Sequence, residues 1–299
     1  MRQGKRAGKR TISLKTHSTS IRISARFRAL KSNLAIGLEA IHSLFFFGAA
    51  GLVALGGYIN SVVGVSTSLY PILWAAGGLF VYNLDRLIPD AADRINLPER
   101  SEFHRTRKVL IAISLLALLV LPVLVSNWKT LAWILLGVTI SPFYCLAPQG
   151  FTQRIKDFPL LKCLAPPLVI LVTLTIPIWI EPETRSLVFS HGPFLVAVLL
   201  ALLVNILLFD LRDRIGDQST GLKTVANRLQ PRSFFILLNV LLLTQISLSI
   251  SEKRIEMIGL GLYLSTLVWL SRKLRKPAFY HWAVDGMLFV PGIVAAIFN

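Results

Sequence analysis

Nine long apolar stretches constrain what this chain can fold into more than any motif does. A helix needs about 20 mainly apolar residues to cross the hydrocarbon core of a membrane, so each stretch is a candidate span. With 54% hydrophobic and 16% charged residues, the 299-residue chain is too apolar for a soluble domain. We therefore predict an all-α, polytopic membrane protein. The expected spans are residues 34–59, 61–84, 108–126, 130–147, 163–180, 193–209, 233–250, 256–270 and 282–298.

The basic residues predict how these spans are oriented. If the N-terminus is cytoplasmic, all but four of the 32 Lys and Arg lie on the cytoplasmic side, an asymmetry typical of multi-pass membrane proteins. Nine spans then place the C-terminus outside. Topology and contacts with anionic membrane lipid explain the net charge of +17, so no nucleic-acid partner is needed. The cytoplasmic segments are then 1–33, 85–107, 148–162, 210–232 and 271–281 with Lys108, and the exceptions are Lys129, Arg185, Lys253 and Arg254.

The first 33 residues carry ten Lys and Arg, many Ser and Thr, and no acidic residue. Three interpretations stay open: a disordered basic tail on an anionic membrane surface, an organelle transit peptide, or in part an interfacial helix. Ile21, Phe27 and Leu30, interleaved with basic residues, favour an interfacial helix for the last part of this segment. We therefore divide the chain into a basic, disordered tail at 1–20 and a transmembrane domain at 21–299.

A run of three aspartates directly follows the apolar stretch that ends at Phe209. In Asp210-Leu-Arg-Asp213-Arg-Ile-Gly-Asp217, spacings of three and seven residues place the carboxylates on one face if the helix continues. Such a face needs cations or water to relieve its repulsion. Because Mg²⁺ is usually held by one or two carboxylates plus substrate phosphates, the run predicts a magnesium site for a phosphorylated, lipid-like substrate. The alternative interpretation is a solvated acidic helix end.

A second acidic run follows the second expected span and contains Asn83, Asp85, Asp90 and Asp93. The predicted topology places it on the same membrane side as the run that begins at Asp210. The two runs follow spans 2 and 6, which fits a bundle of two related halves that face one central cavity. Two acidic clusters on one side favour a functional site over a solvated surface.

Paired aspartate-rich motifs after the second and sixth helices of a nine-helix bundle resemble the UbiA superfamily of intramembrane prenyltransferases. The resemblance covers about residues 20–299. The later motif is the more specific one, because Asp217 is followed by Gly221-Leu-Lys-Thr224-Val-Ala226, which is similar to the family's G-x-x-T-x-A segment. The resemblance implies a UbiA-like bundle around a central cavity.

The chain departs from the family pattern in both motifs. Phe209 stands where family members often have Asn, and Asn205, one turn earlier, is a candidate substitute. In the earlier motif, residues 93–100 fit the family's distal end, with Asn96 at the family's Asn, but the proximal acids have altered spacing. Pro89 also disfavours a regular helix there.

The loop after the fourth span provides a third match. Tyr144 and the segment Arg154-Ile-Lys156-Asp-Phe-Pro159-Leu-Leu-Lys162 resemble the family's Tyr and Lys/Arg-containing loop that contacts the diphosphate. A basic side chain there neutralises charge that develops on the leaving group as the prenyl C–O bond breaks. The alternative is that these basic residues only determine topology.

The resemblance implies Mg²⁺-dependent transfer of a prenyl group from a prenyl diphosphate to an aromatic or other hydrophobic acceptor, in a bacterial inner or plastid membrane. The aspartate loops would be cytoplasmic or stromal. A non-catalytic lipid-binding relative and a prenyl-diphosphate cyclase stay open, whereas a transporter is expected to carry its acids at mid-membrane. The implied metal ligands are Asp85, Asp90, Asp93, Asp210, Asp213 and Asp217; the diphosphate-binding residues are Asn83, Arg86, Tyr144, Arg154, Lys156 and Asn205; the catalytic residues are Asp213, Asp217 and Lys156.

Overall fold

The computed structural model of the protein describes residues 45–66, 70–87, 91–98, 128–145, 154–180, 182–274 and 276–298, with isolated residues at 102, 108, 111, 112 and 120. The chain divides into two units, Met1–His42 and Ser43–Asn299, and all described residues belong to the second. The predictions for residues 1–33, and most of the expected span 108–126, lie outside the described residues.

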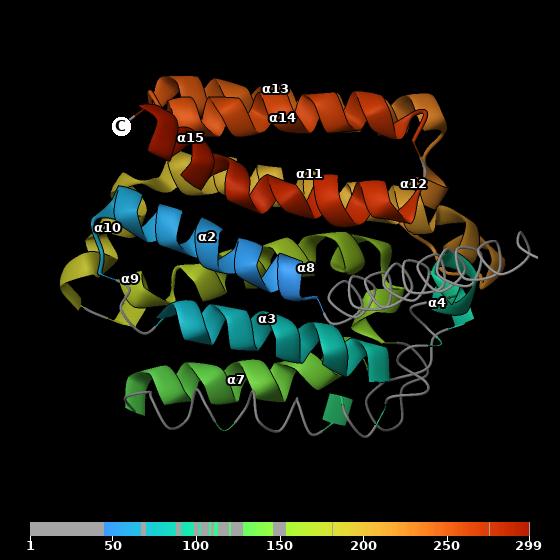
Figure 1. The fold of residues 1–299 in the computed structure, drawn as a ribbon, viewed down its shortest axis with the longest axis horizontal. Coiled ribbons are helices and arrows are strands. Elements are labelled where there is room, and N and C mark those ends of the chain that lie inside the picture. Colours follow the sequence, from blue (N-terminus) through green and yellow to red (C-terminus); the bar gives the residue numbers. More distant parts are fainter. Residues whose placement is uncertain are drawn as a thin grey trace, which may run out of the picture. The chain divides into compact units, whose positions relative to one another are not determined.

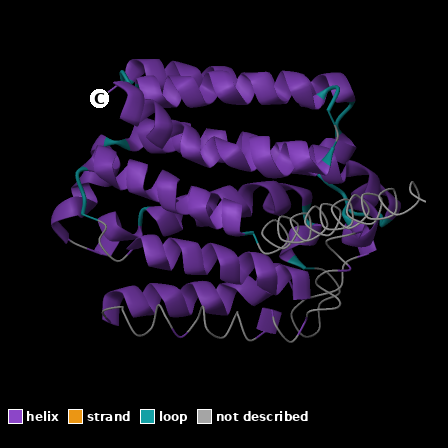
Figure 2. Ribbon diagram, in the orientation of Figure 1, coloured by secondary structure: helices purple, strands orange, loops and turns teal. Residues whose placement is uncertain are grey.

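The regular structure of the described residues is helical, without a strand among them (Figure 2). The first half contains α2 (Phe46–Val63), α3 (Tyr70–Leu87), α4 (Ala91–Asn96), α7 (Trp128–Cys145), the 3-10 helix η1 (Ile155–Asp157), α8 (Pro159–Leu174) and α9 (Ile176–Ile180). The second half contains η2 (Pro182–Thr184), α10 (Arg185–Ser190), α11 (Gly192–Ser219), α12 (Val225–Arg228), α13 (Pro231–Ser251), α14 (Ile255–Ser271), η3 (Phe279–Val284), η4 (Asp285–Phe289) and α15 (Val290–Phe298).

Four helical segments in the described part of the chain are long and apolar enough to cross a membrane: α2, α11, α13 and the continuous segment Phe279–Phe298. Two further apolar helices, α8 and α14, are shorter. The long helices run side by side, roughly parallel or antiparallel to one another (Figure 1). The predicted all-helical class, with several apolar helices of membrane-crossing length, is therefore confirmed.

The expected boundary between the first two spans, at residue 60, is wrong. α2 continues through Asn60 to Val63 and ends where Gly64 takes a left-handed backbone with φ of 81°, a conformation that favours glycine. Asn60 stays inside the helix because its amide Nδ2 donates to the carbonyls of Gly56 and of Leu174 in α8, each at 2.8 Å. The polar residue therefore joins two helices instead of ending one.

The expected single span at 163–180 is interrupted at Thr175, where α8 ends and α9 follows. Pro177 has no N–H, so it cannot bond to the carbonyl of Thr173 four residues earlier. Trp74 of α3 takes this place, because its Nε1 donates to the Thr173 carbonyl at 3.1 Å. Trp74 from α3 and the Asn60 amide from α2, which donates to the Leu174 carbonyl, thus cap the end of α8 with hydrogen bonds.

The expected span at 282–298 begins as the π-helix η3, continues as the 3-10 helix η4 and then becomes α15. Two side chains bond to carbonyls where the helix type changes. Tyr263 of α14 donates its hydroxyl to the carbonyl of Ala283 at 2.7 Å, and Asn205 of α11 donates its amide to that of Val284 at 2.9 Å. The change of helix type is therefore supported by hydrogen bonds from α14 and α11.

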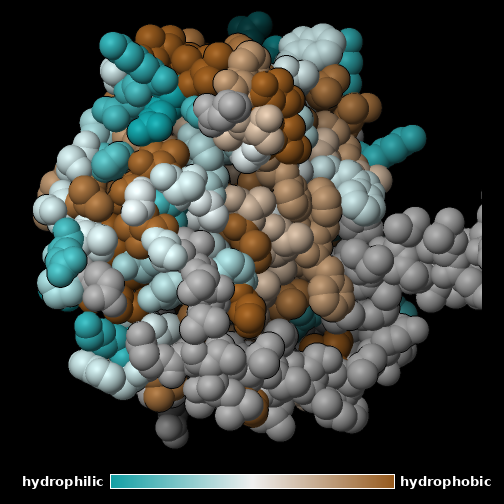
Figure 3. All heavy atoms as spheres, turned by 60° about the vertical axis from the view of Figure 1, so that its left-hand side comes forward, coloured by the Kyte–Doolittle hydropathy of each residue, from teal (hydrophilic) through white to brown (hydrophobic). Residues whose placement is uncertain are grey.

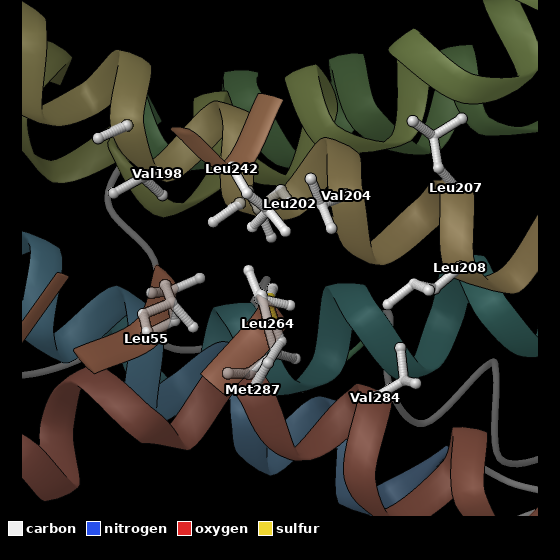
Figure 4. Packing of buried hydrophobic residues seen from close by; sticks show 14 of the residues in the cluster. Leu55, Val198, Leu202, Val204, Leu207, Leu208, Leu242, Leu264, Val284 and Met287 are labelled. Carbon is white, nitrogen blue, oxygen red and sulfur yellow. The ribbon is translucent and has the colours of Figure 1, made fainter. Parts of the chain in front are cut away.

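The central helix of the described bundle is α11, which packs against α4, α8, α13 and α14. Ala197, Ala201 and Val204 on this helix are at most 1% exposed, and the small side chains of the two alanines let neighbouring helices approach closely. Leu202 of α11 faces Leu264 of α14 in the same packed region (Figure 4). The helix that carries the second aspartate motif is therefore fixed from several sides.

Large hydrophobic side chains cover much of the described surface. Trp128, Phe189 and Ile297 are 75%, 81% and 69% exposed, and similar residues occur on most of the long helices. In the space-filling view, brown and tan hydrophobic residues adjoin one another over much of the described face (Figure 3). A soluble protein rarely exposes such surface, so it suits contact with lipid.

Candidate functional site

The helix that bears the second aspartate motif continues beyond the apolar stretch to Ser219, so all three aspartates lie on α11. It ends in a Schellman motif, in which the N–H of Leu222 donates to the carbonyl of Asp217 at 2.8 Å and that of Gly221 to Gln218 at 3.2 Å. Gly221 takes a φ of 75°, which glycine adopts without strain. The glycine of the trailing segment therefore ends the motif helix.

The remaining residues of the trailing segment build the next turn. Thr224 is fully buried and is the N-cap of α12, and its hydroxyl accepts the N–H of Asn227 at 3.2 Å. Ala226 is buried beside it, and α12 contacts both α11 and α8. The segment thus fixes the chain directly after the aspartates.

Asp210 and Asp217 share one cation, the ammonium of Lys162 in α8. The Lys162 Nζ lies 2.7 Å from Asp217 Oδ2 and 3.4 Å from Asp210 Oδ1. A spacing of seven residues is close to two helical turns, so both carboxylates leave α11 on the same face. Their side chains are only 5% and 4% exposed, and that of Lys162 is 17% exposed. The structure therefore forms a buried, charged cluster between α8 and α11.

One oxygen of this cluster is unsatisfied. Asp210 Oδ2 is buried and has no hydrogen-bond partner, although the other oxygen of the same carboxylate faces Lys162. Buried polar atoms are nearly always bonded, and a carboxylate oxygen can accept from a donor or bind a cation. Asp210 therefore presents a vacant acceptor beside the carboxylate of Asp217 and the ammonium of Lys162.

Asp213 has a different partner from the other two aspartates. Arg212 donates to both of its carboxylate oxygens, from Nε and from Nη2, each at 2.7 Å. The Arg212 guanidinium also lies 4.7 Å from the ring centre of Phe209 and 5.9 Å from that of Tyr280, which is a cation–π arrangement. Phe209, at the position where the family often has Asn, thus supports the arginine that holds Asp213.

Asn96 connects the two aspartate motifs. Its Oδ1 accepts the N–H of Gly216 at 2.8 Å, and its Nδ2 donates to the carbonyl of Asp213 at 2.9 Å. A Cβ on Gly216 would lie 2.5 Å from three atoms of the Asn96 side chain, so only glycine leaves room for this amide. The distal end of the first motif, on α4, therefore lies directly against the second motif on α11.

The other predicted residues of the first motif are described only in part. Asp85 and Arg86 lie in α3 and Asp93 in α4, but their side chains, and the whole of Asp90, lie outside the described residues. Asn83 is buried, and its Nδ2 donates to the carbonyl of Leu79 at 2.7 Å. Asn205, the candidate substitute for the missing family Asn, directs its amide nitrogen to Val284.

The predicted diphosphate loop has its own ion pair. Arg154 donates from its backbone and from Nη2 to the carboxylate of Asp157, at 2.8 Å in each case. Burial raises the pKa of Asp157, but the hydrogen bonds and the charge of Arg154 outweigh it and hold that pKa below its ordinary value. Lys156 is buried in η1, and Tyr144 is half-buried in the last turn of α7, which contacts η1.

Part of this arrangement fits a divalent cation. Asp210 and Asp217 both face the Lys162 ammonium, and Mg²⁺ usually takes one or two carboxylates together with phosphate oxygens. Among the described residues, no group of three or more His, Cys, Asp or Glu side chains is placed to hold a metal ion. Further ligands would come from a substrate or from Asp85, Asp90 and Asp93.

The sequence favoured Lys156 in this region, whereas the structure places Lys162 against Asp210 and Asp217. A signal for it was present, because Lys162 is the charged residue within the otherwise apolar sequence of α8. A charge in such a helix is costly unless it faces a partner. The spacing of the aspartates likewise gave no sign that Arg212 pairs with Asp213.

The fold and the site together define a helical membrane protein with a buried acidic cluster near the C-terminal end of its central helix. Comparisons of the chain with family models, with curated proteins and with solved structures found no match. The resemblance to the UbiA superfamily therefore depends on the motif residues themselves.

Proposed function

We propose that the protein is a prenyltransferase of the UbiA type, which transfers a prenyl group from its diphosphate to a hydrophobic acceptor within the membrane. The observation that carries this proposal is the convergence of Asp210 and Asp217 on one cation, next to a first motif that Asn96 holds against α11. A diphosphate that binds with a metal ion needs carboxylates to hold the metal ion and basic side chains to bind the phosphate oxygens. Carboxylates and basic side chains meet here.

Each group of residues has a distinct role in this proposal. Asp210 and Asp217 hold Mg²⁺ with Asp213, Asp85, Asp90 and Asp93, as the resemblance implies. Bound Mg²⁺ supplies Lewis-acid charge to the diphosphate oxygens. The basic residues of the loop, Lys156 and Arg154, bind the diphosphate with Tyr144, Asn83, Arg86 and Asn205, and the apolar interior excludes water from the reactive prenyl cation.

The proposal extends to topology. We propose nine spans, of which the described helices account for part, with a cytoplasmic or stromal N-terminus and the C-terminus on the other side of a bacterial inner or plastid membrane. The basic residues of the cytoplasmic segments support this orientation. The aspartate motifs then face the compartment that supplies soluble diphosphates and Mg²⁺.

The test is binding of a non-hydrolysable prenyl thiodiphosphate to the detergent-purified protein, with and without Mg²⁺, because it requires no knowledge of the acceptor. We expect Mg²⁺-dependent binding that falls by at least about tenfold in Asp210→Asn, which corresponds to about 1.4 kcal/mol. Glu183→Gln is the matched control, because Glu183 is an exposed carboxylate in η2. Equal binding by wild type and Asp210→Asn would remove Asp210 from the site.

A non-catalytic lipid-binding relative is the second candidate. Each carboxylate of the second motif already faces a cation of the chain itself, Lys162 or Arg212, which favours a stable structure without metal. If a folded wild-type sample binds no prenyl thiodiphosphate of several chain lengths in Mg²⁺, this second function replaces the first.

A further inference from the structure

Lys162 is the cation that Asp210 and Asp217 hold in common. Its Nζ is within hydrogen-bond distance of Asp217 and 3.4 Å from Asp210. Lys162 faces two buried carboxylates at once, and Asp210 Oδ2 remains without a hydrogen-bond partner. Asp210 can therefore still accept a cation, yet the face that it shares with Asp217 is already occupied by the Lys162 side chain.

The helix turn around Lys162 has fewer backbone hydrogen bonds than an ordinary turn. Pro166 and Pro167 lie in α8, four residues after Lys162 and Cys163. Proline lacks an N–H, so the carbonyls of Lys162 and Cys163 receive no helical hydrogen bond from these positions. The N–H of Lys162 still donates to the carbonyl of Phe158 at 2.8 Å. The turn that carries Lys162 therefore lacks two of the helical hydrogen bonds to the turn that follows it.

The lysine side chain itself suits movement. It is a compact ammonium on a flexible four-carbon stem, whereas an arginine in the same place would hold two oxygens in a fixed, planar geometry. A divalent ion that binds Asp210 and Asp217 is repelled by an ammonium 2.7 Å from one of the carboxylates. The ion and Lys162 therefore compete for the same oxygens.

We propose that Lys162 is a tethered cation that occupies the Asp210–Asp217 pair in the metal-free protein and is displaced when a divalent ion binds. The displaced ammonium then lies beside the metal and is free to contact a phosphate oxygen, so metal and diphosphate each strengthen binding of the other. Lys162 is a positioning residue in this role. The inference rests on the proposed function in taking Mg²⁺ and a diphosphate as the ligands.

Binding of Mn²⁺, measured by electron paramagnetic resonance without any diphosphate, tests the competition directly. We expect Lys162→Gln to bind Mn²⁺ more tightly than wild type, by on the order of tenfold. Lys162→Arg is expected to bind it more weakly than wild type, because the guanidinium grips both carboxylates. Lys223→Gln removes an exposed charge shortly after α11 and is expected to leave Mn²⁺ binding unchanged.

A second readout is thermal stability in detergent. Without metal, Lys162→Gln leaves the carboxylate pair without its cation, so its melting temperature is expected to fall below that of wild type and to rise more on addition of Mn²⁺. Unchanged or weaker Mn²⁺ binding by folded Lys162→Gln would overturn the inference. If that variant does not fold, Mn²⁺ binding by Lys162→Arg equal to that of wild type overturns it instead.

Failure of this inference and failure of the proposed function give different results. Mg²⁺-dependent binding of prenyl thiodiphosphate by wild type, with equal Mn²⁺ affinity in all Lys162 variants, refutes the competition and keeps the function. Tighter Mn²⁺ binding by Lys162→Gln, with no binding of the donor by wild type, supports the competition and refutes the function.

Discussion

A single methyl group at position 216 is expected to separate the two aspartate motifs. In Gly216→Ala, the new Cβ would lie 2.5 Å from Cγ, Nδ2 and Oδ1 of Asn96, a distance that real Cβ atoms do not tolerate. Asn96 must then leave α11 and lose its bonds to the Gly216 N–H and the Asp213 carbonyl. The substitution therefore changes the contact between α4 and α11 without altering a charge.

The magnitude follows from two opposing effects. Two lost hydrogen bonds cost about 2 kcal/mol in total, at about 1 kcal/mol each. Alanine in place of glycine inside a helix returns about 1 kcal/mol. We expect Gly216→Ala to destabilise the protein by about 1 kcal/mol net. In an Asn96→Ala background the amide is absent, so the same substitution is expected to stabilise by about 1 kcal/mol.

The assay is a double-mutant cycle on Asn96→Ala and Gly216→Ala, with unfolding in mixed detergent micelles followed by tryptophan fluorescence. The expected coupling free energy is about 2 kcal/mol. Gly57→Ala in α2 is the control, because a Cβ there meets nothing within 4 Å. If Gly216→Ala has the same effect in both backgrounds, the amide does not lie against Gly216 and the reasoning is refuted.

Two other substitutions test local features of the site. Asp157→Asn is expected to lower the melting temperature at about pH 7. Because Arg154 holds the Asp157 pKa below its ordinary value, the stabilisation by Asp157 is present above the ordinary pKa and is lost as the pH falls through the lowered pKa. The difference in melting temperature from wild type should therefore shrink below about pH 4, and a pH-independent difference would contradict this. Gly221→Ala places a Cβ on a residue with a left-handed backbone and is expected to lower the free energy of unfolding in detergent by about 1–2 kcal/mol. Gly221→Asn is expected to lower it by less, and equal losses for the two variants would refute the backbone argument.

The long apolar helices could be predicted from sequence because the membrane sets their length and composition. The expected spans 233–250 and 256–270 differ from α13 and α14 by at most two residues at either end. The interruption at Thr175 was not predictable in the same way, because it depends on Trp74 bonding to a carbonyl 99 residues away. Apolar patterning locates helices, but not the cross-helix bonds that decide where they end.

The candidate site shows the same division. Spacing alone predicted that Asp210 and Asp217 share a helix face, since that follows from helical geometry. It could not reveal Lys162, which lies 55 residues before Asp217 in the chain and on another helix. Helical spacing also could not predict the bidentate hydrogen bonds from Arg212 to Asp213, because side chains of adjacent residues do not normally face each other on a helix.

The capped end of α8 has a consequence for biogenesis. The carbonyls of Thr173 and Leu174 are bonded by Trp74 and Asn60, side chains that belong to α3 and α2. A carbonyl that is removed from water without a hydrogen bond is costly, so the broken conformation of α8 and α9 is favourable only when the two earlier helices already lie against them. The order of synthesis, in which α2 and α3 emerge first, therefore suits the order in which this part of the bundle must assemble.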